Sequence, residues 1–173
     1  GMQIESDARR LTELLPGHRI AVTGNLKFSC LNSGSLLEKK GYYRTIFSLK
    51  PEDNVFLAGN VHVQECEMIL KAFVIARDEI ENLILVLTPR FIQSVPFIKS
   101  LLMKRGVAFI ARTELNDRPR KTEPVILVDT IGELVDMYTI ADVAFVGGSL
   151  VYLGDMFGGH NILEPAAAES PIL

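Results

Sequence analysis

The chain has 173 residues, of which 48% are hydrophobic and 23% charged, ordinary values for one folded globular domain and unlike those of a disordered chain. Its 18 basic and 21 acidic side chains give a net charge of −3, so no basic excess marks a nucleic-acid partner. Two cysteines are too few for a disulfide framework. No apolar run of the sequence approaches the roughly 18–20 residues that a bilayer-spanning helix needs.

Short β-branched runs alternate with longer helical stretches along the chain. We expect helices at residues 6–15, 35–49, 64–80, 91–105, 131–138 and 161–169. We expect strands at residues 19–23, 55–58, 83–88, 107–111, 125–128 and 143–146, and the start of another at 171–173. Pro96 predicts a kink or a restart within the fourth helix.

This alternation of strand and helix predicts parallel βαβ crossovers and hence an α/β fold, a doubly wound parallel sheet with helices on both faces. In such sheets ligands bind beyond the carboxyl ends of the strands. The residues that follow each strand are therefore where function is to be sought.

Polar and glycine residues recur at those strand ends. The segments are residues 23–27, 58–62, 88–90, 129–133, 147–149 and 158–161. Glycine, asparagine and aspartate form turns for structural reasons alone, which is the simplest explanation of any one segment. Turns rarely need Lys27, His62, Arg90 and His160 as well, so the set together points to a site for an anionic ligand.

The last of these segments opens a predicted helix. A helix amino terminus favours a phosphate or a carboxylate, and glycine lets the ligand approach the backbone. Asn161 is equally explained as an N-cap. Glu164, in the first turn, either complements the helix dipole or accepts hydrogen bonds from a diol such as a ribose.

Several standard motifs are missing from the sequence. It contains no GxxxxGK[ST] phosphate loop, no GxGxxG dinucleotide fingerprint and no GxSxG nucleophile elbow. The three histidines lack metal-ligand spacing. Cys66, within a predicted helix, is interpreted as a packing residue.

Motifs spread over nearly the whole chain resemble the C-terminal half of the 3-deoxy-D-manno-octulosonic acid (Kdo) transferases. In chain order they are residues 2–10, 22–28, 129–134, 141–151 and 158–167. The resemblance implies that residues 1–173 are one nucleotide-sugar-binding domain, Rossmann-like, from a two-domain GT-B glycosyltransferase. An N-terminal acceptor domain and the final C-terminal elements would lie outside this chain, and Pro171-Ile172-Leu173 would begin an unfinished strand.

The implied reaction is inverting, metal-independent transfer of Kdo from CMP-Kdo to a lipid A precursor, without a cofactor, in lipopolysaccharide synthesis. The implied place is the cytoplasmic face of a Gram-negative inner membrane, with membrane contact only through the N-terminal domain. That domain would also supply the acidic general base, so the fragment alone is expected to be inactive.

The resemblance also implies roles for individual residues. Arg90 and Lys27 would stabilise the departing phosphate, and Asn25 would face the sugar. The remaining implied donor-binding residues are His62, Thr130, Ile131, Gly132, Glu133, Gly148, Ser149, Gly159, His160, Asn161 and Glu164. Among these, Glu164 would hold the ribose, residues 159–161 the phosphate, and residues 129–133 the cytosine.

The sequence departs from the family pattern at three places. After the second predicted strand it keeps only the histidine of a Ser-Thr-His-Glu-like run, as Asn60-Val61-His62-Val63. Phe91 stands where the family often has histidine, and residues 152–157 lengthen the link before the phosphate segment. Two alternatives remain open: another GT-B enzyme that uses a UDP-sugar, for transfer or epimerisation, and a non-catalytic α/β module that binds an anion or a partner protein.

Overall fold

The computed structural model describes residues 2–24, 36–152 and 159–173. The chain divides into two compact units, residues 1–34 and 35–173. In the first unit α1 (Glu5–Leu14) confirms the predicted helix. The strand predicted at residues 19–23 is wrong, because this segment forms only a single parallel bridge between Met2 and Val22. Val22 stays exposed, so burial of an apolar face does not stabilise a longer strand there.

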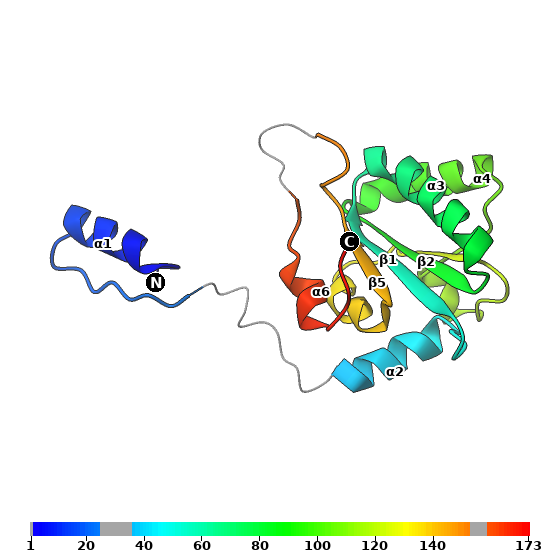
Figure 1. Ribbon diagram of the computed structural model, residues 1–173, viewed down its shortest axis with the longest axis horizontal. Coiled ribbons are helices and arrows are strands. Elements are labelled where there is room, and N and C mark those ends of the chain that lie inside the picture. Colours follow the sequence, from blue (N-terminus) through cyan, green and yellow to red (C-terminus); the bar gives the residue numbers. More distant parts are fainter. Residues whose placement is uncertain (1, 25–35, 153–158) are drawn as a thin grey trace. The chain divides into compact units, whose positions relative to one another are not determined.

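The second unit contains a five-stranded sheet in which every strand pairing is parallel (Figure 1). Its strands are β1 (Asn54–Val61), β2 (Leu83–Pro89), β3 (Phe109–Ala111), β4 (Val125–Leu127) and β5 (Val143–Val146). They lie in the order β3-β4-β2-β1-β5. The predicted doubly wound α/β fold is therefore confirmed.

Helices connect the strands of this unit. The α-helices are α2 (Leu36–Ile46), α3 (Val63–Glu79), α4 (Val95–Lys104), α5 (Leu134–Met137) and α6 (Leu163–Ala167), and the 3-10 turns are η3 (Ile92–Ser94), η4 (Thr113–Asn116) and η5 (Tyr138–Ile140). The helix predicted at residues 91–105 is split into η3 and α4. Pro96 lies in the first turn of α4, where its missing N–H breaks no helical hydrogen bond.

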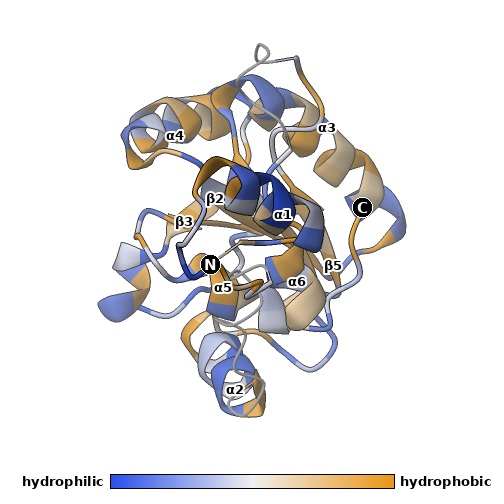
Figure 2. Ribbon diagram, turned by 90° about the vertical axis from the view of Figure 1, so that its left-hand side faces the viewer, coloured by the Kyte–Doolittle hydropathy of each residue, from blue (hydrophilic) through white to orange (hydrophobic). Residues whose placement is uncertain are grey.

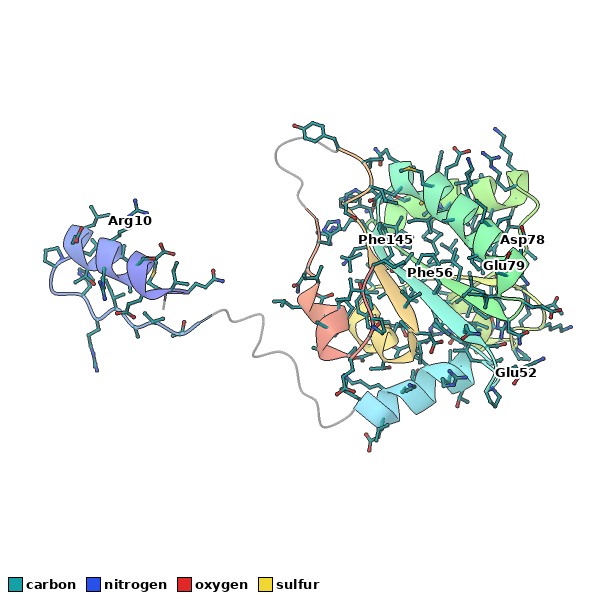
Figure 3. The ribbon with its side chains drawn as sticks, viewed as in Figure 1. Arg10, Glu52, Phe56, Asp78, Glu79 and Phe145 are labelled. Carbon is teal, nitrogen blue, oxygen red and sulfur yellow. The ribbon has the colours of Figure 1, made fainter. Side chains whose placement is uncertain are left out.

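Two hydrophobic clusters cover the two faces of the sheet. One joins buried side chains of α3 and α4 to the strands, and the other does the same for α2, α5 and η5. Successive side chains of β1 alternate between them, with Val55 and Leu57 in the second cluster and Phe56 and Ala58 in the first. The strands carry mainly hydrophobic residues, whereas α2 and α3 carry both kinds (Figure 2). Phe56 in β1 and Phe145 in β5 belong to the first cluster and lie on neighbouring strands (Figure 3).

The chain reverses its direction of travel across the sheet at β1. The crossover through α3 carries it from β1 to β2, whereas the later crossover through α5 and η5 brings it back to β5, on the other side of β1. Such a switch point opens a crevice at the carboxyl ends of the strands.

The last residues of the chain pair with the outer edge of β5. Ile172 forms an isolated parallel bridge with Ala144, so the strand expected to begin at residues 171–173 is present only as this single bridge. Within the described residues, no helix combines the length and the apolar character that crossing a bilayer requires.

Candidate functional site

The carboxyl end of β1 is shaped by a backbone irregularity. The strand register shifts between Ala58 and Val61, and Asn60 adopts a positive φ of 54°, which is uncommon for a residue other than glycine. The hydroxyl of Thr88, in β2, donates to the Ala58 carbonyl at 2.9 Å and accepts the Asn60 N–H at 3.3 Å. This cross-strand contact fixes the backbone at the end of β1, just before His62.

A crevice of about 380 Å³ lies at the carboxyl ends of β1, β2 and β4. Its lining includes Asn60, Thr88, Arg90, Phe91, Thr130, Ile131 and Gly132. Four of the predicted donor-binding residues (Arg90, Thr130, Ile131 and Gly132) are therefore brought together from segments 40 residues apart, although the sequence placed them after different strands.

A larger hollow of about 430 Å³ lies away from these strand ends, between α3 and the segment after α4. Aliphatic residues such as Leu70, Val74 and Ile75 line most of it, and Glu67 and Arg105 form an ion pair at its margin. The crevice is the better candidate site, because it carries the convergent polar groups that a nucleotide needs and the larger hollow does not.

Arg90 presents an exposed guanidinium to the crevice. Its backbone N–H donates to the Val61 carbonyl at 2.8 Å, which anchors the residue to the end of β1. Its guanidinium carbon lies 5.6 Å from the ring centroid of Phe91, within cation–π range. Arg90 is thus a cation held at one place and available to a phosphate or carboxylate.

His62 and His160 meet across the strand ends from positions 98 residues apart. Their Nε2 atoms are 2.8 Å apart and their rings are nearly parallel, with centroids separated by 5.0 Å. Phe91 packs edge-on against His62 at 5.9 Å. Burial, the nearby positive charge of Arg90 and the second histidine hold the pKa of His160 below its ordinary value, although Glu65 opposes the shift.

Segment 130–133 presents its backbone and Ile131 outward while its acidic side chain turns inward. Ile131 is 82% exposed and Gly132 has φ +86°. Glu133 instead accepts hydrogen bonds from the buried Arg112 at 3.0 Å and from the hydroxyl of Thr130. Both carboxylate oxygens of Glu133 therefore accept hydrogen bonds within the protein, and Thr130, Ile131 and Gly132 are the residues of this segment that line the crevice.

Gly148 and Ser149 lie just after β5, and their backbone N–H groups point to a protein carboxylate. Gly148 donates to both oxygens of Glu65, at 2.9 and 3.0 Å, and Ser149 donates to Oε1 at 3.1 Å. The φ of Gly148 is +86°, a conformation that glycine adopts without strain. These N–H groups are thus occupied within the protein.

The segment after residue 158 forms a shorter helix than the one predicted at residues 161–169. The side-chain oxygen of Asn161 accepts the Leu163 N–H at 3.1 Å, and its amide group donates to Glu164 at 3.2 Å. The N-cap residue of α6 is Ile162, so the interpretation of Asn161 as the N-cap is wrong by one residue; Asn161 precedes the cap, and its side chain accepts the first helical N–H. Because α6 has only five residues, its dipole is weak. Gly159 and the Nε2 of His160 are therefore better candidates for a phosphate contact than the amino terminus of α6.

Two predicted residues, Asn25 and Lys27, lie outside the described residues, as does most of the lengthened link at residues 152–157. In the part of the chain that the structure describes, no three His, Cys, Asp or Glu side chains gather in a way that would hold a metal ion. Cys66 is fully buried, and burial raises the pKa of its thiol to about 12, as expected for a packing residue.

Sequence reasoning missed Glu65 and the contacts of Phe91. Glu65 stands three residues after His62, at the spacing of a capping box, and its carboxylate accepts the His62 N–H at 2.9 Å. A capping box usually has serine or threonine at its first position, so the sequence pattern with histidine at that position was not recognised as one.

The sequence is similar to parts of known proteins. Over 168 residues it is 38% identical to the 3-deoxy-D-manno-octulosonic acid transferase of Haemophilus influenzae, covering 97% of this chain and 38% of that protein. It is 36% identical over 167 residues to a bifunctional glycosyltransferase/methyltransferase of Fusobacterium nucleatum, covering 95% of this chain and 24% of that protein. No protein-family model matches the chain.

Among solved structures, the chain is similar to the C-terminal CMP-Kdo binding domain of WaaA from Acinetobacter baumannii. The TM-score is 0.67 at 24% sequence identity, and the match covers 80% of this chain and 69% of that one. The fold is therefore shared. The resemblance to Kdo transferases that the motifs indicated is confirmed over almost the whole chain, which spans less than two fifths of the length of the Haemophilus relative.

Proposed function

We propose that this chain, a homologue of the C-terminal part of the Kdo transferases, is a donor-binding domain that takes CMP-Kdo in its crevice. The observation that carries the proposal is the convergence of Arg90 with residues 130–132 in one crevice at the strand ends. An exposed guanidinium suits the phosphate or the Kdo carboxylate, and the Ile131–Gly132 segment offers an apolar surface and backbone groups to a base.

His62 and His160 supply the second half of the proposed phosphate site. The ring of His62 packs against Phe91, which also carries the Arg90 guanidinium, and the Nε2 of His62 contacts that of His160, so a bound anion would meet two imidazoles and one guanidinium. Glu164, half-buried next to Asn161, is proposed to accept the ribose hydroxyls. Lys27 and Asn25 are proposed to face the sugar.

In the parent protein we propose inverting, metal-independent transfer of Kdo to a lipid A precursor at the cytoplasmic face of the inner membrane. A carboxylate base of another domain would deprotonate the acceptor hydroxyl, which attacks the anomeric carbon of Kdo as the bond to the CMP phosphate breaks. Arg90 would stabilise the negative charge that develops on that phosphate. This chain would supply the donor half of the reaction, and transfer would need the rest of the parent protein.

Calorimetric titration with CMP, UMP and AMP tests the donor assignment. We expect CMP to bind this chain more tightly than UMP or AMP, and Glu164→Ala to weaken CMP binding by roughly tenfold, as for one lost hydrogen-bonded carboxylate. Glu52→Ala is the matched control, because Glu52 precedes β1 at the opposite end of the sheet (Figure 3).

Preference for UMP would instead favour the GT-B enzymes that use UDP-sugars. Equal binding of all three nucleotides, or an unchanged affinity in Glu164→Ala, would contradict the assignment. The same titrations are repeated on the full-length parent protein, so that weak binding by the separate domain is not mistaken for the absence of a site.

A further inference from the structure

Glu65 is a charged side chain buried in an unusual way. Its relative exposure is 0%, although it lies in the first turn of α3 beside the strand ends. Its described partners are all backbone N–H groups: His62 on Oε2, Ser149 and Leu150 on Oε1, and Gly148 on both oxygens. All five contacts lie between 2.9 and 3.1 Å. Such a site stabilises an ionised carboxylate through oriented amide dipoles.

The carboxylate joins two loops that are distant in sequence. His62 follows β1, and Gly148, Ser149 and Leu150 follow β5, more than 80 residues later. These are the two strands that flank the switch point of the sheet. Glu65 therefore sets the relative position of the two loops at the place where ligands bind in folds of this kind.

The effect of Glu65 extends to the histidine pair. The His62 N–H that Glu65 accepts fixes the residue whose ring meets His160. The His160 N–H donates to the Gly147 carbonyl at 3.2 Å, so His160 is attached to the same loop that Glu65 holds. The Glu65 carboxylate thus holds the backbone of His62 directly and that of His160 through the loop of Gly147 and Gly148.

The negative charge of Glu65 matters because four backbone N–H groups donate to its two oxygens. Burial alone would raise the pKa of Glu65, but the N–H groups of Gly148, His62, Leu150 and Ser149 outweigh it and hold the pKa below its ordinary value. Glutamine has a single acceptor oxygen, so its NH₂ group would face a backbone N–H of one loop or the other. With its oxygen in the Oε1 position the amide would lose the His62 N–H, and in the Oε2 position it would lose the N–H groups of Ser149 and Leu150, so it cannot satisfy every donor of both loops.

We propose that Glu65 is a positioning residue of the donor site, whose carboxylate locks the loops after β1 and β5 together so that His62, His160 and Ser149 are held ready for the ligand. This inference rests on the proposed function for the nature of the ligand. The locking of the loops stands independently of it.

The test compares Glu65→Gln and Glu65→Asp with the control Glu67→Gln, two residues along the same helix. Glu67 is exposed and forms an ion pair with Arg105. Amide hydrogen exchange of the free proteins and CMP affinity are both measured. In Glu65→Gln we expect exchange at Gly148, Ser149 and Leu150 to quicken by at least about tenfold while the amides of β1 and β2 keep their protection. CMP should bind about 10- to 100-fold more weakly, the usual effect of a misplaced binding group.

Glu65→Asp keeps the charge but shortens the side chain, and we expect it to restore part of both effects; it carries the same comparison if Glu65→Gln does not fold. Glu67→Gln should change neither quantity. Faster exchange spread over the whole sheet would show a merely structural role and overturn the inference, as would unchanged CMP affinity with faster loop exchange. If the unaltered chain does not bind CMP, the proposed function fails, while the exchange data still decide whether Glu65 locks the loops.

Discussion

Asp53 and Glu65 are buried carboxylates near the two ends of the sheet, and they are satisfied in different ways. At the amino end, Arg120 and Asp53 form an ion pair at 2.7 Å, with side chains only 6% and 8% exposed. Arg120 also donates to the carbonyls of Phe47, Ser48 and Glu123, and Asp53 accepts the Lys50 N–H. At the carboxyl end, Glu65 is buried on backbone donors, and the Arg90 guanidinium is exposed at the crevice.

This difference identifies the Arg120–Asp53 pair as a structural charge cluster and the region of Glu65 and Arg90 as a candidate binding site. In the Arg120–Asp53 pair each charge faces its opposite, and three backbone carbonyls accept further hydrogen bonds from the guanidinium, so the charge of Arg120 is used within the protein. At the carboxyl end the Glu65 carboxylate is satisfied by neutral amides, and the exposed Arg90 guanidinium at the crevice keeps its charge for an incoming anion. Perturbation of the first cluster should affect stability, and perturbation of the second should affect binding.

The largest expected effect is on stability at the amino end. Arg120→Met leaves Asp53 buried without its partner, which typically costs about 3–5 kcal/mol. We expect a loss of that size in the free energy of unfolding measured in urea, with unchanged CMP affinity for the protein that remains folded. Arg118→Met is the control, because Arg118 is 41% exposed and its ion pairs contribute less than about 1 kcal/mol. Equal losses in the two variants would remove the distinction between the Arg120–Asp53 pair and an ordinary surface pair.

Next in size is the effect of the exposed cation at the carboxyl end. Arg90→Ala should weaken CMP binding by about 1.5–3 kcal/mol, the value of a hydrogen bond to a charged group, with little change in unfolding free energy. Arg105→Ala removes the same charge at the hollow beside α3 and should leave binding unchanged. Calorimetry on both variants measures the contrast, and weaker binding in Arg105→Ala alone would move the ligand to the other hollow.

A steric change tests how closely β1 and β5 approach at the site. A Cβ added at Gly147 would come within 2.8 Å of the Asn60 carbonyl carbon and 2.9 Å of Val61 Cα, so Gly147→Ala should cost about 1–3 kcal/mol of stability, as overpacking does. Gly159→Ala meets nothing within 4 Å and should stay within about 0.5 kcal/mol. Thermal unfolding of the pair gives the comparison, and a harmless Gly147→Ala would mean that the loops are more loosely joined.

The smallest effect is on pH dependence. Because the pKa of His160 lies below 6.5, the unfolded chain takes up this proton first as pH falls, and the contribution of His160 to stability declines below about pH 6.5. A bound phosphate favours the imidazolium, so CMP affinity should rise as pH falls from 7.5 to 6. Measuring the pH dependence of CMP affinity for His160→Gln as well separates the effect of His160 from the protonation of the CMP phosphate itself. Identical pH profiles for the two proteins would exclude a phosphate beside His160.

Much of the fold could be predicted because its signals are local. The apolar runs of β1, β2 and β5 follow from burial on both faces, and their bounds agree with the predicted strands to within a few residues. The strand predicted at residues 19–23 was wrong because its apolar run pairs only with Met2 among the described residues 2–24 of its own unit. The helix predicted at residues 161–169 was too long, because α6 begins at Leu163 and ends at Ala167, before Glu169 adopts a positive φ of 59°, and apolar periodicity does not encode these ends.

The site was predictable only as a set of strand ends. The sequence placed Arg90, His62 and His160 beyond strands, and the fold brought them together. It did not show that Glu133 turns toward Arg112, nor that Glu65 receives N–H groups from residues more than 80 positions away. Such contacts depend on strand order, which no local pattern encodes.

The central claim is that the carboxyl end of the sheet binds the nucleotide. Backbone amide NMR of the labelled chain, titrated with CMP, tests it directly. We predict saturable shifts at Asn60, Arg90, residues 130–132 and residues 159–164, with none along residues 71–75 of α3. Shifts centred on residues 71–75 and Arg105, or no saturable shifts at all, would contradict it.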